Sequence, residues 1–382
     1  MVKDKFLRGA LILTCAGLAV KFLGAFNRIL LSRLLGGEGI GLYQMAYPVY
    51  LLMVSVSSAG IPIAISIIVA EKVAKNDYSG AGRIFRVSLG LMAVTGILFA
   101  LMLYGLANFL IANAYIRDER AYYALLALIP AVFFATILAS FRGFFQGHQM
   151  MTPPAISQII EQFVRVVTMV ALAYVFLPSG LEYAAAGAAF GAVPGAITGL
   201  VVLTYFYLKN RKQWLKYEQP AVSGVQESIV TISGRLLKLA LPVSCANIML
   251  PVVTGIDMLL VPNRLEVAGY SVEQATTLFG YFAGMALPLI MLATIPTASL
   301  AMRLCLLITL PATAGLFALA EPVSLLLYGT RYAVPAIANL APAICLLGLH
   351  QVTTGILQGV GAPLIPMANM IVSILVKVGI VW

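Results

Sequence analysis

Charged residues are scarce in this 382-residue chain. Only 10% of its residues are Asp, Glu, Lys or Arg, whereas soluble domains carry about 25%. Hydrophobic residues make up 61% of the chain, and the mean hydropathy is +0.98. The composition excludes an ordinary soluble domain and predicts a protein that crosses the membrane several times, with membrane lipids around it. The net charge of +10 does not indicate a nucleic-acid partner, because no basic soluble stretch with interleaved aromatic residues is present.

The residues that build catalytic and metal sites are also few. Histidine occurs only as His148 and His350, which lie far apart in the sequence. The four cysteines are scattered through apolar runs without Cys-x-x-Cys spacing, so we interpret them as small buried hydrophobic residues. No phosphate-binding loop and no Ser/His/Asp pattern is found. We therefore expect no enzyme activity, no bound metal and no cofactor, apart from a coupling Na⁺ or H⁺.

Long apolar runs dominate what is present. Each is long enough to cross a bilayer and lacks the alternation of a membrane β-strand, so each predicts a helix. The runs lie at roughly 9–35, 41–70, 84–112, 121–146, 153–177, 182–208, 236–261, 275–299, 304–327, 333–358 and 364–382. The sequence thus predicts an all-α polytopic transmembrane helix bundle with about 11 spans.

The charges between these runs predict how the chain is oriented. If the N-terminus lies in the cytoplasm, most of the 24 basic residues fall in cytoplasmic loops. Only Arg117, Arg120, Arg264 and Arg331 then fall in outer loops. Basic residues collect on the cytoplasmic side of membrane proteins. We therefore expect a multi-pass protein of the cytoplasmic membrane with a cytoplasmic N-terminus.

The longest polar stretch, 209–235, divides the chain into two lobes. We expect an N-terminal lobe of six spans at 1–208, a cytoplasmic linker at 209–235 and a C-terminal lobe of about five spans at 236–382. The lobes are related by weak repeats: Pro154 recurs as Pro366, and Arg165 as Lys377. Two pseudo-symmetric lobes are typical of transporters that bind substrate between their halves.

The second lobe is shorter than the first in this comparison. Pro62 and Arg83 are 21 positions apart, whereas the matching Pro296 and Arg303 are only 7 apart. We expect the second lobe to be internally shortened near 299–303 and truncated at its end. A non-transporting, truncated membrane scaffold is therefore an alternative interpretation of the chain.

Three cations interrupt the first apolar run: Lys21, Arg28 and Arg33. A charge at membrane depth costs several kcal/mol unless it faces a polar interior. Lys21 and Arg28 are seven residues apart and share one helical face. We interpret them as cavity residues that bind an anionic, phosphate-bearing group, with snorkelling or internal pairing as the alternative. Arg33 lies near the end of the run, which favours an interfacial role.

A second charged group lies in the fifth run, where Glu161 and Arg165 are four residues apart. One interpretation is a local ion pair that neutralises both side chains. The other adds Arg165 to the lining of the same basic cavity, with Lys377 as its counterpart across the repeat.

Asp257 is the only acid in the seventh run. A lone carboxylate within the membrane is a candidate ligand for a coupling cation, Na⁺ or H⁺. Asn247 on the same run and Asn369 on the last run can supply further oxygen ligands. The alternative is a hydrogen bond, or an ion pair with Arg264.

Short motifs along the chain carry a family resemblance. They include Lys21-Phe22-Leu23-Gly24, Gly36-Gly37-Glu38-Gly39, Gly60-Ile61-Pro62 and Arg142-Gly143-Phe144-Phe145-Gln146-Gly147. With these motifs the chain resembles the stage V sporulation protein B group. That group belongs to the multidrug/oligosaccharidyl-lipid/polysaccharide exporter superfamily and is similar to the lipid II flippases.

The resemblance implies a flippase that moves a polyprenyl-pyrophosphate-linked saccharide by alternating access. The implied substrate is a peptidoglycan precursor for the spore cortex or cell wall, and the implied partners are cell-wall synthesis proteins, with the flippase itself a monomer. In this resemblance Lys21 matches a cavity arginine, Asn27 replaces a second one with Arg28 beside it, and Asp257 matches a cation-site acid. A multidrug or cation exporter is the alternative, although drug cations favour acidic cavities rather than basic ones.

Overall fold

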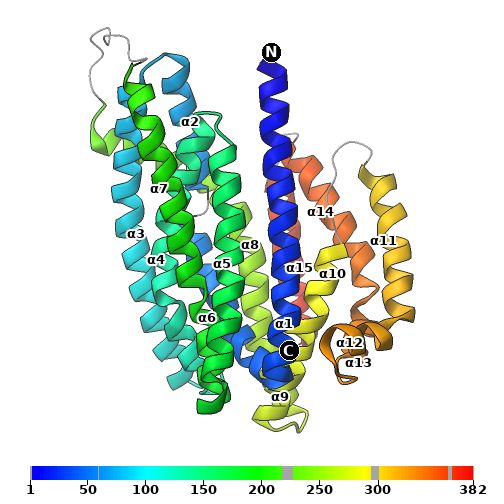
Figure 1. Cartoon of the computed structure of the whole chain (residues 1–382). Helices are drawn as coiled ribbons and strands as arrows, with labels where there is room; N and C mark the ends of the chain where they lie inside the picture. The colour runs from blue at the N-terminus through cyan, green and yellow to red at the C-terminus, as the bar shows by residue number, and fades with distance from the viewer. Residues whose placement is uncertain (1, 59, 217–226, 294–300, 360–363, 382) are drawn as a thin grey trace.

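The computed structural model describes residues 2–58, 60–216, 227–293, 301–359 and 364–381. Within these ranges every regular element is a helix and no strand occurs (Figure 1). The predicted all-α class is confirmed. Of the shortening expected near 299–303, positions 299 and 300 lie outside the described residues and 301–303 begin the helix Ala301–Ala318; positions 217–226 of the predicted linker also lie outside the described residues.

The first part of the chain forms α1 to α7. These helices are α1 (Val2–Ser58), α2 (Ile61–Ala74), α3 (Tyr78–Ala112), α4 (Ala121–Gly147), α5 (Thr152–Phe176), α6 (Leu181–Phe190) and α7 (Ala192–Lys216), with a 3₁₀ turn at Leu177–Ser179. Local sequence explains several starts. Pro62 and Pro153 lie in the first turns of α2 and α5, where a missing N–H is tolerated. The side chain of Asp77 caps α3 by accepting a hydrogen bond from the Gly80 N–H at 2.7 Å.

The second part forms α8 to α15. They are α8 (Ile229–Val267), α9 (Val272–Phe279), a π-helical segment (Gly280–Ala286), α10 (Leu287–Ala293), α11 (Ala301–Ala318), α12 (Ala320–Tyr328), α13 (Val334–Leu340), α14 (Ala343–Gly359) and α15 (Leu364–Val381). Ser228 caps α8, and Ser271 caps α9 in a reciprocal arrangement with Gln274.

The helix breaks differ from the expected ends of the apolar runs. The first helix does not end near 35 but continues through a kink at Gly36 to Ser58. Gly36 has φ 66° and ψ −171°, a backbone conformation open to glycine and strained for other residues. The run expected at 41–70 is therefore divided between the second half of α1 and the short α2.

The number of membrane spans also differs from expectation. By length and apolarity, five described helices can cross a membrane, or up to seven if each bent pair counts as one span. The bent pairs are α11–α12, with an angle of 80°, and α13–α14, with an angle of 48°. The expected count of 11 is not confirmed, because breaks of this kind divide runs that are continuous in hydropathy.

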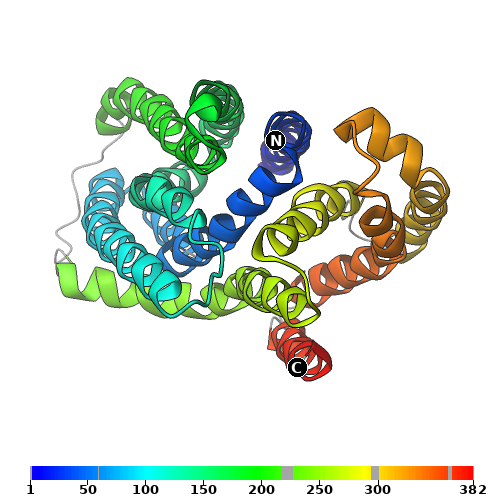
Figure 2. The same ribbon diagram turned by 90° about the horizontal axis from the view of Figure 1, so that it is seen from below.

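The arrangement of the helices places α1 in the middle of the molecule. Seen from below, α1 lies between α2–α7 on one side and α9–α14 on the other, while α15 lies at the edge beside α8 (Figure 2). Buried aromatic side chains, Phe85 of α3 and Phe144 and Phe145 of α4, fill the core between α2, α3 and α4. A second core packs α1 against α4 and α6. The expected division into lobes at 209–235 stays a prediction.

Candidate functional site

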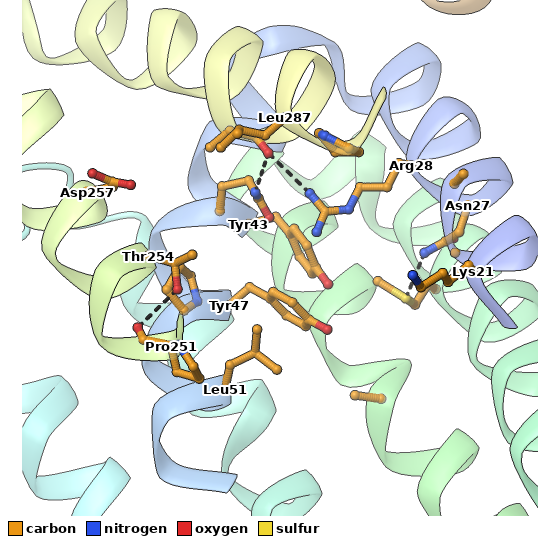
Figure 3. A pocket seen from close by; sticks show the side chains of 18 of the residues that line it. Lys21, Asn27, Arg28, Tyr43, Tyr47, Leu51, Pro251, Thr254, Asp257 and Leu287 are labelled. Carbon is orange, nitrogen blue, oxygen red and sulfur yellow. Dashed lines mark hydrogen bonds between the residues drawn. The ribbon is translucent and has the colours of Figure 1, made fainter. Parts of the chain in front are cut away.

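A cavity of about 440 Å³ lies between α1 and helices of both groups. Its lining comes from α1, α5, α7, α8, α10 and α14 and from the region of α9 and the π-helical segment. The charged residues of the lining are Lys21, Arg28, Arg165 and Asp257. Figure 3 shows Arg28 beside the rings of Tyr43 and Tyr47, with Asp257 on a different helix. The structure thus brings together cations that are 144 positions apart in the chain, Lys21 and Arg165.

The first half of α1 supplies two of these cations on one face. The side chain of Lys21 is exposed, and Arg28 donates a hydrogen bond from Nη1 to the carbonyl oxygen of Ala283 at 3.3 Å. The guanidinium of Arg28 also lies 5.8 Å from the ring centroid of Tyr47. Asn27 is buried, and its Nδ2 donates to the sulfur of Met169 at 3.2 Å. All three residues line the cavity, as the seven-residue spacing of Lys21 and Arg28 predicts for that pair.

The π-helical segment faces these α1 residues. The Ala283 carbonyl accepts a second hydrogen bond, from Nε2 of Gln44 at 2.7 Å. Short π-helical stretches widen one turn of a helix and often occur at functional sites. Here the widened turn presents one carbonyl to both Arg28 and Gln44 from the two halves of α1.

Arg165 lines the cavity from α5 and is also half of an ion pair. Its Nη2 donates to Oε1 of Glu161 at 2.8 Å, and Arg142 of α4 donates to Oε2 of the same carboxylate at 2.5 Å. Gly195 of α7 permits this approach, because a Cβ there would lie 3.0 Å from Cβ of Arg165. Arg165 therefore both pairs with Glu161 and lines the cavity, as the two interpretations of this pair expected. Glu161 itself is outside the lining, and because two arginines share it, the group keeps a positive charge.

Asp257 lines the cavity from α8, and its carboxylate forms an ion pair with Lys377 of α15. Lys377 is not among the lining residues, so the structure places it at Asp257 rather than at the predicted anion site. Asn369 is exposed on α15 and does not line the cavity. The side chain of Asn247 lies outside the described residues.

Arg33 lies outside the cavity. Its side chain is exposed, and its Nε donates to the carbonyl of Leu327 at 2.8 Å, at the C-terminal end of α12. A cation at a helix C-terminus is favourable because the last carbonyls carry partial negative charge.

Several lining residues were not singled out from the sequence. Gln44, Gln162 and Gln351 are polar residues within apolar runs, and their position at membrane depth is the signal that points to them. Tyr43 and Tyr47 are four residues apart and stack with ring centroids 5.3 Å apart; in an apolar run such aromatic residues are more often interface or packing residues than substrate platforms.

The sequence matches the family described as polysaccharide biosynthesis protein over residues 6–302. The chain belongs to this family. A relative is stage V sporulation protein B of Bacillus subtilis (strain 168), which is 31% identical over 408 residues, covering 100% of this chain and 78% of the relative. The lipid II flippase MurJ of the same organism is 27% identical over 417 residues, covering 98% of this chain and 76% of MurJ.

A solved structure shows the same fold for this member of the polysaccharide biosynthesis protein family. The inward-facing conformation of a multidrug resistance MATE family transporter of the MOP superfamily superposes with a TM-score of 0.69 at 17% identity, covering 94% of this chain and 84% of the transporter. The expected resemblance and fold class are confirmed. The protein is a multi-pass membrane protein of the flippase and exporter type; among its relatives MurJ is named a lipid II flippase, and the similar solved structure is named a multidrug transporter.

Proposed function

We propose that this protein moves a lipid-linked saccharide with a pyrophosphate head group across the cytoplasmic membrane by alternating access. The observation that carries the proposal is that Lys21, Arg28 and Arg165 line one cavity between the two groups of helices. Cations at membrane depth are costly unless a counter-charge offsets them. The one acid in the lining, Asp257, is already neutralised by Lys377. The cavity therefore has a surplus of positive charge for an anionic head group.

The donors in the cavity suit phosphate. Arg28 makes a single long hydrogen bond to a backbone carbonyl, which leaves most of its N–H groups for a ligand. Lys21 is exposed and supplies a mobile ammonium on the same face. Arginine binds phosphate oxygens in a planar, two-bond geometry, and lysine adds a compact charge.

The polar side chains of the lining suit a saccharide. Asn27 and Gln44 are each 6% exposed, and their side-chain oxygens lack a hydrogen-bond partner among the described residues. Buried polar atoms are nearly always paired in folded proteins, so these two oxygens favour a ligand with donor groups. Sugar hydroxyls meet that need, and the stacked rings of Tyr43 and Tyr47 offer an apolar face beside them.

The cavity volume of about 440 Å³ falls in the range of about 300–1,000 Å³ that small-ligand sites occupy. It suits the head group, while the lipid tail stays in the bilayer. The names of the relatives, a lipid II flippase and a sporulation protein, favour a peptidoglycan precursor for the cell wall or spore cortex. Cell-wall synthesis proteins are the partners that such a substrate implies.

The multidrug-exporter alternative requires a cavity that attracts cations. The lining here carries three basic residues and one acid that is already paired. The charge balance therefore favours an anionic ligand. The scaffold alternative predicts no such cavity between the helix groups.

The test is a flipping assay in proteoliposomes that contain a fluorescent pyrophosphate-linked saccharide lipid. The double variant Lys21→Ala/Arg28→Ala should flip at least about tenfold more slowly, since hydrogen bonds to charged groups contribute about 1.5–3 kcal/mol each. Arg33→Gln is the matched control, because Arg33 lies on the same helix outside the cavity and should leave flipping unchanged. Equal rates for the double variant and the unmodified protein would refute the proposal.

A further inference from the structure

The ion pair between Asp257 and Lys377 connects the cavity to the helix at the edge of the molecule. Asp257 is 9% exposed on α8, and Lys377 is the only charged residue within α15. In Figure 2, α15 lies beside α8 at the periphery. Its other faces expose Val372, Leu375 and Val376. Lys377 is thus the charged contact that α15 makes with α8.

While it is ionised, the carboxylate of Asp257 needs a counter-cation. A buried carboxylate without a counter-charge is strongly disfavoured, and within the membrane the cost applies equally to a bare ammonium. One cation at a time is enough to satisfy Asp257. While the ammonium of Lys377 contacts the carboxylate, a free monovalent cation gains little by entering. If α15 leaves α8, a free cation, Na⁺ or H⁺, must replace the ammonium.

We propose that Lys377 is a tethered cation that competes with free Na⁺ for Asp257, so that Na⁺ binding and the docking of α15 on α8 exclude one another. This inference rests on the proposed transport function and on the expectation from the sequence that Asp257 is a candidate ligand for a coupling cation. Na⁺ is a hard cation that takes oxygen ligands. Thr254, one turn before Asp257 on α8, also lines the cavity and places a hydroxyl on the same side of the helix.

The competition has a consequence for transport. A ligand that binds one of two conformations better shifts the population toward it by its difference in affinity. Free Na⁺ therefore favours the arrangement in which α15 has left α8, and Lys377 favours the arrangement described here. Exchange between the two cations at one carboxylate links the cation gradient to the position of α15.

The experiment measures binding of radioactive Na⁺ to the purified full chain in lipid nanodiscs, without saccharide lipid. If the ion pair is formed about nine-tenths of the time, it lowers the apparent Na⁺ affinity about tenfold. Lys377→Met should therefore bind Na⁺ about tenfold more tightly than the unmodified protein. Lys377→Arg, which keeps the tethered cation, should stay at the unmodified affinity. The double variant Lys377→Met/Asp257→Asn should lose this gain in Na⁺ affinity.

Lys377→Gln serves as a second neutral variant if Lys377→Met does not fold. Equal Na⁺ affinity in the unmodified protein and in a folded neutral variant would overturn the proposal. A gain that persists without the carboxylate of Asp257 would overturn it as well. Because the assay contains no saccharide lipid, its failure is separate from the failure of the proposed function, which shows in the flipping assay.

Discussion

The two halves of α1 differ sharply in how they are held. After the kink at Gly36, the residues from Gly37 to Tyr50 are almost all buried, whereas Phe22 and Phe26 before the kink are 62% and 55% exposed. The second half crosses the region of α9 and the π-helical segment in close contact. The first half is held by α5, through the Asn27–Met169 hydrogen bond, and by hydrogen bonds from Arg28 to the π-helical segment and from Arg33 to α12.

This difference shows where α1 packs most closely against the second group of helices. Gly41 lies so close to α9 that a Cβ would be 2.1 Å from the carbonyl oxygen of Thr276, and a Cβ at Gly280 would be 2.0 Å from that of Gly37. Small residues let helix backbones approach in membranes. The backbone of α1 thus packs closely against α9 and the π-helical segment at the end of the molecule where α1 kinks, which we call the kink end. Two of the three cavity cations, Lys21 and Arg28, lie on the looser first half.

The largest effect should follow from adding one methyl group to the tight half. Gly41→Ala places its Cβ against the Thr276 carbonyl, a backbone atom that cannot easily move, and should lower the free energy of unfolding by about 3 kcal/mol. Gly17→Ala is the matched control in the loose half, since no atom lies within 4 Å of its added Cβ. It should be neutral or raise stability by up to about 1 kcal/mol.

Thermal unfolding of both variants in the same detergent measures this contrast. Equal unfolding temperatures for Gly41→Ala and Gly17→Ala would mean that the close crossing does not exist.

An intermediate effect on the free energy of unfolding is expected from a group of charged residues at the kink end, Arg120, Asp118 and Glu38. Arg120 donates to Asp118 at 2.8 Å and to Glu38 of α1 at 2.6 Å, and Asp118 accepts from Thr276 of α9 at 3.0 Å. These bonds, that to Asp118 above all, raise the pKa of Arg120. Asp118 is 3% exposed, so removing the arginine leaves its buried negative charge without that counter-charge.

Arg120→Ala should therefore lower the free energy of unfolding by about 2 kcal/mol, below the full cost of an orphaned buried charge because Arg120 is partly exposed. Arg117→Ala is the control on the same loop, where the side chain is 50% exposed and bonds to Asn263. It should cost less than about 1 kcal/mol. Chemical denaturation measures the free energy of unfolding of both variants. A larger loss of stability for Arg117→Ala than for Arg120→Ala would contradict this prediction.

The smallest effect concerns the opposite end, where α2 meets the start of α8. Lys72 and Arg235 each pair with Glu227 at 3.1 Å. Burial alone would raise the pKa of Glu227, but the hydrogen bonds from Lys72 and Arg235 outweigh it and lower the pKa. The stabilisation is therefore present above the ordinary pKa of about 4.3 and is lost as the pH falls below it.

Unfolding temperatures of the unmodified protein and Glu227→Gln, compared between pH 6 and pH 3, test this sign. The two unfolding temperatures should converge as the pH falls. At pH 6 the difference in the free energy of unfolding should be below about 1 kcal/mol, because partly exposed ion pairs contribute little. A difference that grows toward low pH would show that the carboxylate is not stabilised by these partners.

The contrast between the halves of α1 also shows what the sequence can predict. The spacing of Lys21 and Arg28 was enough to place both on one cavity face, because helical periodicity is a local property. The hydropathy runs predicted helices, but not the 80° bend between α11 and α12, because an apolar run stays continuous through a bend. The pairing of Asp257 with Lys377 was not predictable, because it depends on how two distant helices are oriented.

The measurement that tests the account most directly is competitive binding to the purified full chain in nanodiscs. The competitors are a pyrophosphate-linked saccharide lipid and a lipophilic drug cation. The account predicts that the anionic lipid displaces the cation, and that Lys21→Gln/Arg28→Gln weakens lipid binding at least about tenfold. Tighter binding of the drug cation, unaffected by the double substitution, would contradict a basic cavity built for an anionic head group.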